Sequence, residues 1–348
     1  MNQKQLYRWP KRVSKRLVGT TRHFQANVRL FSGAVARAGS SQVRKIAGAS
    51  GQRADSARRR LQRFVVQKQS LEVFFVGWTR QVLDMVTSRC VVLVVDEMDL
   101  GGRLRVMVVG VVFEGRCIPL VWRVYIANSH DDYPAEGQVA MVTAMLTLVK
   151  QGMPRRKRVR VLADRGIGTS PELMRNLMAL KWTFLFRVTR QSKIILPDGR
   201  EVTFYDQVQH PGESYSASGK VFKKRGRIAA HVRVLWGADA KERWALVTND
   251  PALTGWEYAQ RMWIEEAFRD LKSHGWQVED VLWTDPERMA RLWILLVLAY
   301  AWMLLLGAAK EASGLTASPK HKKDGTQVRR WSLFREGRQA YLAYAPPL

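Results

Sequence analysis

The chain has 348 residues, 47% of them apolar, which is enough for two domains or one elaborated domain with a packed core. Its 57 Lys and Arg outnumber its 30 Asp and Glu, and the net charge of +27 exceeds what solubility requires and indicates a polyanionic partner. The basic residues are spread along the chain rather than gathered beside a membrane-inserting segment, so nucleic acid is favoured over an anionic membrane surface.

Residues 1–85 have helical spacing and predict an all-α domain. A short helix near 43–47 is followed by a break at Gly51 and a second helix, for which Asp55 or Ser56 would be the cap, in a helix-turn-helix pattern. An ordinary basic helical hairpin without DNA contact is the alternative. Removing residues 1–85 should cost sequence preference more than non-specific binding. The side chains that would reach bases or phosphates in a major groove are Arg58, Arg59, Arg60 and Arg63.

From residue 90 the sequence changes to apolar, β-branched runs that predict strands. Three strands with short turns form a meander, and a helix at 136–151, a strand at 158–163, a helix capped by Ser170 and a fifth strand follow. The order βββαβαβ is that of a ribonuclease-H-like domain of the α/β class, with a mixed sheet in which strand 4 lies beside strand 1. Residues 86–189 would form its first part. Asp96 and Asp164 then lie at carboxyl ends of strands, where open sheets build their sites.

Residues 190–252 interrupt this pattern with short strand candidates, Gly, Pro and Ser turns and a basic run at 223–227. We interpret them as a β-strand insertion domain. Residues 253–312 return to helical spacing and supply the second part of the catalytic core. Residues 313–348 are basic and turn-rich, and predict a loosely ordered tail.

Residues 256–276 predict one helix with an apolar back and a charged front. Counted from Tyr258, the other three front residues lie 3, 7 and 14 positions later, and at 100° per residue all four fall within about 60° of one another. A solvated face with ion pairs at helical spacing is the alternative. The four front residues are Tyr258, Arg261, Glu265 and Lys272.

Carboxylates are the candidate metal ligands. Asp96 and Asp164 each end an apolar strand, where an unpartnered buried carboxylate would cost several kcal/mol. A divalent cation relieves that cost, and because the six histidines are scattered, Mg²⁺ or Mn²⁺ is favoured over zinc. Glu265 is the natural third ligand, and two metals would suit phosphodiester chemistry. The remaining candidates are interpreted as supporting or solvated groups: Glu97, Asp99, Asp131, Asp132 and Glu266.

The spacing Y-(2)-R-(3)-E-(6)-K, with the segments VVDEM, ADRG and WALVTND, resembles bacterial DDE transposases of the family-four insertion-sequence group over residues 90–310. The resemblance implies that Asp96, Asp164 and Glu265 bind two Mg²⁺ (or Mn²⁺) per active site. It implies a flipped base stacked on Trp244, for which plain core packing is the alternative. The residues implied to contact phosphates near the transposon end are Tyr258, Arg261 and Lys272.

The resemblance implies a cut-and-paste transposase that binds terminal inverted repeats, cleaves the ends through a hairpin and joins the 3′-hydroxyl ends to target DNA. Two ends must be held together, so we expect a homodimer on double-stranded DNA. One alternative is a ribonuclease-H-like nuclease or resolvase without strand transfer. Another is a domesticated DNA-binding protein, against which the intact triad argues.

The location of the protein is expected to be the bacterial cytoplasm, in association with the nucleoid. Cys90 and Cys117 lie among apolar neighbours and predict two reduced thiols rather than a disulfide framework. The first residues lack the uninterrupted apolar core of a signal peptide. Residues 292–309 are uncharged and reach the lower limit for a membrane span, but a core helix has the same composition, so no membrane is expected.

Overall fold

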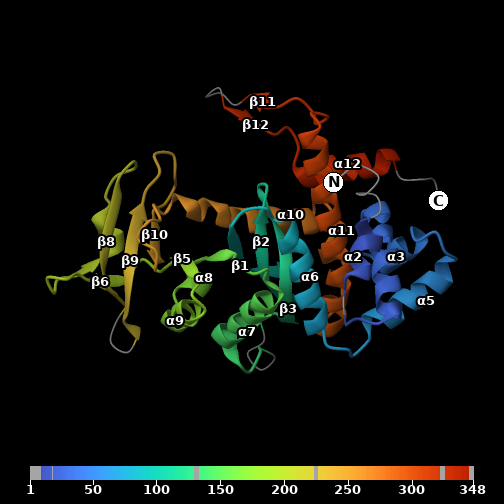
Figure 1. Cartoon of the computed structure of the whole chain (residues 1–348), viewed down its shortest axis with the longest axis horizontal. Coiled ribbons are helices and arrows are strands. Elements are labelled where there is room, and N and C mark those ends of the chain that lie inside the picture. Colours follow the sequence, from blue (N-terminus) through green and yellow to red (C-terminus); the bar gives the residue numbers. More distant parts are fainter. Residues whose placement is uncertain (1–8, 18, 129–132, 223–225, 322–325, 345–348) are drawn as a thin grey trace.

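The structure, a computed structural model, describes residues 9–17, 19–128, 133–222, 226–321 and 326–344 (Figure 1). Asp131, Asp132 and most of the basic run at 223–227 lie outside these residues. The elements follow one another along the long axis: insertion strands at one end, the central sheet in the middle, and the N-terminal helices at the other end beside the long helix α11 (Pro286–Ala312).

A mixed sheet of apolar strands forms the centre of the molecule. The second strand pairs antiparallel with both the first and the third. The first strand also pairs parallel with the fourth, and the fourth pairs parallel with the fifth. The order β3-β2-β1-β4-β5, joined through α7 (Gly137–Gly152) and α9 (Pro171–Ala179), is consistent with the predicted ribonuclease-H-like arrangement and confirms that strand 4 lies beside strand 1. These strands are β1 (Cys90–Leu100), β2 (Leu104–Phe113), β3 (Arg116–Ile126), β4 (Arg158–Ala163) and β5 (Thr183–Arg187).

The strands of residues 190–252 continue the same sheet instead of forming a separate one. The tenth strand pairs antiparallel with β5 and completes a ten-stranded order, β3-β2-β1-β4-β5-β10-β9-β8-β6-β7. The insertion is therefore hydrogen-bonded to the central sheet through β5. These strands are β6 (Lys193–Ile195), β7 (Glu201–Thr203), β8 (Ser214–Val221), β9 (Ile228–Leu235) and β10 (Trp244–Thr248), with the 3₁₀ helix η1 (Phe204–Gln207) between β7 and β8.

The described part of residues 1–85 forms five helices that pack on one another and on the rest of the chain. The helix cap predicted at Asp55 or Ser56 is wrong, because α5 begins at Ala54 and both residues lie in its first turn. Ser41 donates its backbone N–H to the Trp276 carbonyl at 2.7 Å, which ties these helices to the C-terminal half. The helices are α2 (Trp9–Lys15), α3 (Arg22–Ala38), α4 (Val43–Gly48), α5 (Ala54–Val65) and α6 (Glu72–Met85).

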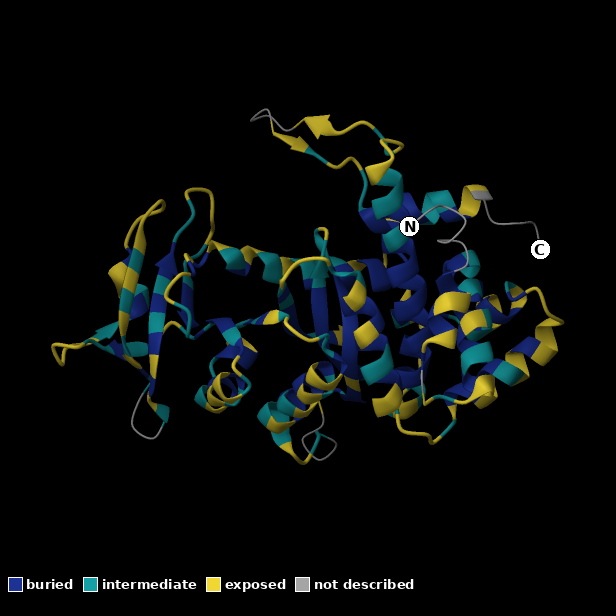
Figure 2. Ribbon diagram, viewed as in Figure 1, coloured by how far each residue is buried: buried dark blue, intermediate teal, exposed yellow. Residues whose placement is uncertain are grey.

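Helix α11 is the central element of the core. It is long and apolar enough to cross a membrane, yet 89% of its most apolar window is buried inside the protein (Figure 2). Trp293 of α11 packs against Trp122 of β3, with ring centroids 6.1 Å apart, and Phe75 of α6 meets the same Trp122 at 4.8 Å. The helix therefore joins the N-terminal helices and the sheet in one hydrophobic core.

The expectation of a loosely ordered tail is wrong for residues 333–344, which form α12 (Leu333–Tyr344) against α11. Phe334 is buried between Trp276 and Tyr300, at centroid distances of 5.0 and 5.5 Å. Gly337 brings the two helices together, because a Cβ there would lie 1.8 Å from the Met303 carbonyl oxygen. Before α12, the chain forms a two-stranded ribbon, β11 (Lys320–His321) and β12 (Gln327–Val328), that stands off the body (Figure 1).

Candidate active site

Two aspartates follow the last paired residues of adjacent parallel strands. Val95 of β1 pairs with Ala163 of β4, and Asp96 and Asp164 come next in each strand direction. Both side chains are thereby brought to one end of the sheet. The side chain of Asp164 also caps the short helix α8 (Arg165–Gly168), since its Oδ1 accepts the N–H groups of the first turn at 3.0 and 3.3 Å. Its other oxygen stays available to the site.

Asp96 is the more buried of the two aspartates, with 7% of its surface exposed. Burial raises its pKa from 3.8 to about 6, and the Arg261 guanidinium offsets part of this rise by favouring the charged carboxylate. Asp164 and Glu265 add a smaller repulsion in the same direction as burial. A cation beside Asp96 would therefore stabilise its charged, metal-binding form.

Glu265 comes from the first turn of α10 (Met262–Leu271), which lies along the sheet. The far end of α10 is held by an ion pair in which Arg116 Nε of β3 donates to Asp270 Oδ2 at 2.8 Å. Asp270 is 3% exposed, and burial raises its pKa to about 6 despite the opposing charge of Arg116. With one end fixed and Ile264 and Ala267 buried against the sheet, the helix holds Glu265 beside the two aspartates.

The prediction of one continuous helix over 256–276 is wrong. Gly255, in the left-handed region at φ +100°, starts a 3₁₀ helix η3 (Trp256–Arg261), and α10 follows it. The 3₁₀ turn advances about 120° per residue, so Tyr258 lies on the same side as Arg261, three positions later. Tyr258 is 2% exposed. Burial raises its pKa well above the ordinary value. Lys272 lies just beyond the end of α10 and pairs with Glu279 of the 3₁₀ helix η4 (Val278–Asp280) at 3.0 Å.

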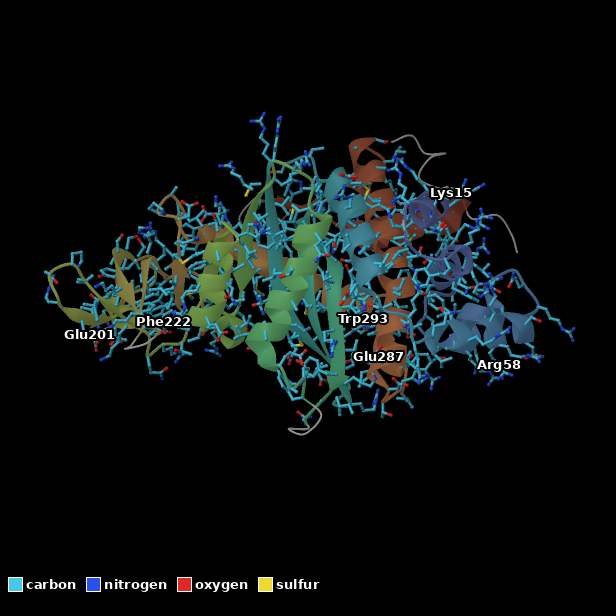
Figure 3. The ribbon with its side chains drawn as sticks, turned by 60° about the horizontal axis from the view of Figure 1, so that its bottom comes forward. Lys15, Arg58, Glu201, Phe222, Glu287 and Trp293 are labelled. Atoms are coloured by element: carbon cyan, nitrogen blue, oxygen red, sulfur yellow. The ribbon has the colours of Figure 1, made fainter. Side chains whose placement is uncertain are left out.

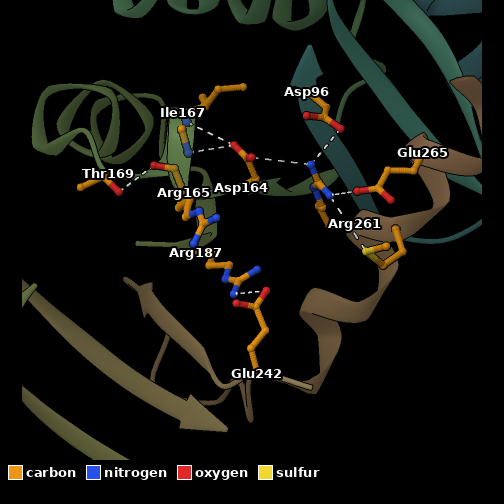
Figure 4. A network of polar contacts seen from close by, with 11 residues as sticks. Asp96, Asp164, Arg165, Ile167, Thr169, Arg187, Glu242, Arg261 and Glu265 are labelled. Carbon is orange, nitrogen blue, oxygen red and sulfur yellow. Dashed lines mark hydrogen bonds and ion pairs between the residues drawn. The ribbon is translucent and has the colours of Figure 1, made fainter. Parts of the chain in front are cut away.

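Arg261 stands at the centre of the three carboxylates (Figure 4). Its Nη2 lies 2.9 Å from Asp96 Oδ2 and 3.8 Å from Asp164 Oδ2, and its Nη1 donates to Glu265 Oε1. The guanidinium side chain is 11% exposed. Burial lowers the pKa of Arg261, but the surrounding carboxylates and Tyr258 outweigh it and the net shift is upward.

The donor set fits a hard divalent cation in kind, because three carboxylates from three elements already converge on one positive group. In the present arrangement, however, the described residues contain no group of three or more His, Cys, Asp or Glu side chains close enough to hold an ion. Asp96, Asp164 and Glu265 are the residues that would hold Mg²⁺ or Mn²⁺, and they would have to exchange the guanidinium for it.

Residues 132–302 match the family model of the transposase DDE domain. The match supports a DDE transposase. It begins before α7 and ends within α11, and it includes Asp164, Glu265 and all the insertion strands, whereas Asp96 lies before it. No curated protein matches the chain.

The residues that match the family model include an aromatic cluster next to the triad. Trp244, half-buried on β10, meets the ring edge of Tyr258 at 5.2 Å between centroids, and lies 6.2 Å from Trp256. The Trp256 side chain is 52% exposed. Trp244 therefore has packing partners and also an accessible part, so both interpretations made from the sequence stay open.

One polar residue of this region, Arg187, was not singled out from the sequence. Arg187 is the last residue of β5, and Asp164 directly follows the last residue of the neighbouring strand β4. The Nη2 atom of Arg187 pairs with a carboxylate oxygen of Glu242 at 2.7 Å (Figure 4). Its position at a strand end was the signal that could have found it. Glu97, named among the candidate carboxylates of the sequence, follows Asp96 on β1 and accepts hydrogen bonds from Tyr125 and Arg105.

The arginines of α5 are far from the triad. Arg58 lies at the outer edge of the N-terminal helices, at the opposite end of the molecule from Glu201 in the insertion (Figure 3). Arg60 donates to Asn27 Oδ1 at 2.6 Å and is half-buried against α3, so it is less free to reach DNA than its neighbours. Arg59 and Arg63 are exposed.

Proposed function

We propose that this protein is a cut-and-paste DNA transposase of the family-four insertion-sequence group. The observation that carries the proposal is the convergence of Asp96, Asp164 and Glu265, from β1, the end of β4 and α10, on one cationic group. The match of residues 132–302 to a transposase DDE domain and the net charge of +27 support it.

The triad holds the metal ions, two Mg²⁺ or Mn²⁺ per active site. When bound, these ions activate the attacking oxygen and stabilise the leaving oxygen of a phosphodiester. Asp96 and Asp164 are fixed by the sheet, and Glu265 is fixed by the anchored helix, so the three ligands keep their relative positions during repeated steps. Lys272 binds phosphates of the transposon end, and Arg261 does so once it has left the three carboxylates. Tyr258, which is 2% exposed, supports this region from within and does not touch the DNA.

The remaining parts bind and arrange the DNA. The exposed arginines Arg58, Arg59 and Arg63 contact the terminal inverted repeats, and two copies of the chain hold two ends together. The protein acts in the bacterial cytoplasm, associated with the nucleoid. Its strongly positive charge suits the phosphate backbone, which supplies most of the affinity of such complexes.

Cleavage of the DNA that flanks the gene tests this function. We expect the purified protein with Mg²⁺ to nick a plasmid carrying those flanks at the boundary of short inverted repeats and to leave 3′-hydroxyl ends, as primer extension would detect. Chelation with EDTA should abolish the nicks. Nicks scattered over the plasmid, or cleavage that persists in EDTA, would contradict the proposal.

Trp244 is expected to stack on a flipped base when the cleaved ends form hairpins. Because its ring is only half-buried, we expect Trp244→Ala to fold, bind ends and make the first nick. Hairpin formation should slow by about 5- to 150-fold, since a stacked base contributes about 1–3 kcal/mol. Trp244→Phe should restore part of the rate. Gel assays of nicked and hairpin products measure each step.

The matched control is Trp256→Ala, which removes the neighbouring exposed ring from the same cluster. If Trp244 only packs in the core, Trp244→Ala should lower the melting temperature and slow the nick and the hairpin step equally. That result would remove Trp244 from the DNA site.

A further inference from the structure

Arg261 is held in a place that the proposed reaction needs for another group. The three carboxylates that would bind metal all direct an oxygen at its two Nη atoms, and its side chain is 11% exposed. Asp96 is 7% exposed, and without a counter-charge its carboxylate would be costly to desolvate and would be repelled by those of Asp164 and Glu265, whose side chains are 36% and 42% exposed. A cation among the three carboxylates therefore stabilises their charged form.

The guanidinium is well suited to be temporary. Only its Nη atoms are used by the carboxylates, and its Nε, although buried, has no hydrogen-bond partner among the described residues. It also comes from the last residue of a 3₁₀ turn, directly before α10, so a change of its own rotamers moves the charge without moving the helix that carries Glu265. The site thus holds Arg261 mainly through the charges of the carboxylates, because the guanidinium does not use all of its hydrogen-bond donors.

We propose that Arg261 is an internal counter-cation of the triad, which occupies the metal position in the DNA-free protein and must be displaced before metal ions load. The proposal rests on the function given above, because it assumes that the triad binds metal. Its consequence is a built-in competition: the protein without DNA binds divalent ions weakly and is protected from unguided nuclease activity. Arg261 is here a positioning residue, which keeps the three carboxylates together until the metal replaces it.

Metal binding to the DNA-free protein tests the competition directly. We expect Mn²⁺, followed by calorimetry and by the electron paramagnetic resonance signal of the free ion, to bind Arg261→Gln at least tenfold more tightly than the wild type. In EDTA, Arg261→Gln should melt several degrees below the wild type, and Mn²⁺ should raise its melting temperature more than it raises that of the wild type.

Two control variants separate charge from other effects. Arg261→Lys keeps a positive group near the carboxylates and should bind Mn²⁺ within about threefold of the wild type. Arg269→Gln removes an arginine from the same helix that pairs with Glu266, 2.9 Å away, rather than with the triad, and should leave Mn²⁺ affinity unchanged.

A second measurement covers the case in which Arg261→Gln does not fold. In the wild type, the side-chain Nε–H resonance of Arg261, assigned by its loss in Arg261→Lys, should shift when Mg²⁺ saturates the protein. An unchanged resonance would overturn the proposal.

The outcomes distinguish this proposal from the proposed function. If Arg261→Gln binds Mn²⁺ no more tightly than the wild type, while Asp96→Asn abolishes binding, the metal site stands and the counter-cation is overturned. If neither the wild type nor Arg261→Gln binds Mn²⁺, and end DNA does not restore binding, the metal site and with it both proposals are overturned.

Discussion

Replacing any one of the three carboxylates should abolish DNA cleavage and leave DNA binding largely intact. We expect Asp96→Asn, Asp164→Asn and Glu265→Gln each to lower the cleavage rate by at least about a thousandfold, because the bound ions stabilise the transition state by several kcal/mol. Affinity for end DNA comes mostly from phosphate contacts and should change little. Cleavage of labelled ends and gel-shift titrations measure the two properties separately.

Two neighbouring carboxylates provide matched controls for the triad. Glu97 is bound by Tyr125 and Arg105. Glu266 pairs with Arg269 at 2.9 Å and with Arg116 at 3.5 Å rather than with Arg261. Glu97→Gln and Glu266→Gln should therefore lower the cleavage rate much less than the triad variants do. A triad variant that still cuts in Mg²⁺, or a control that fails as completely, would contradict the assignment.

Deleting residues 1–85 should prevent the rest of the chain from folding, in contrast to the separable domain that the sequence predicts. Helices α3, α5 and α6 cover α11 and β3, and Trp78 of α6 donates its indole N–H to the Pro119 carbonyl at 2.8 Å. Burial of one such side chain contributes about 1.5–3 kcal/mol, and a whole domain is stable by only about 5–15 kcal/mol. The aromatic side chains lost from the common core are Trp9, Phe24, Phe31, Phe64, Phe74, Phe75 and Trp78.

Solubility and thermal unfolding of the fragment 86–348 check this result. We expect aggregation, or no cooperative transition, because the deletion exposes α11. The full chain with Arg59→Gln and Arg63→Gln is the control: these exposed side chains can be changed without loss of the core, so that variant should melt normally and lose preference for the inverted repeats. A soluble fragment with a cooperative transition would show that the N-terminal helices form a separate unit.

The strands and the two aspartates could be predicted because their signals are local. An apolar, β-branched run that ends in an acidic residue, such as the run before Asp96, predicts a buried strand and places the carboxylate at the end of that run. Strand β8 escaped prediction because its sequence, SYSASGKV, alternates small and polar residues and carries little hydrophobic signal. Helix α12 escaped because its few apolar residues and Gly337 make sense only against α11.

The pairing of Arg261 with Glu265 follows helical spacing, because the two residues are four positions apart at the start of α10. The contacts of Arg261 with Asp96 and Asp164 could not be predicted from that spacing, and neither could the 3₁₀ turn that precedes α10. The sequence identified the right residue types in the right region. Their packing depended on Gly255 and on strands far away in the chain.

Joining of precut ends tests most directly whether the triad belongs to a transposase rather than to a nuclease. The substrate is a labelled transposon end with a free 3′-hydroxyl, incubated with a plasmid target, Mg²⁺ and either the wild type or Asp164→Asn. We predict that the wild type links the end covalently to the plasmid and that Asp164→Asn does not. A wild-type protein that cleaves flanked ends but never joins precut ones would contradict strand transfer and indicate a nuclease or resolvase.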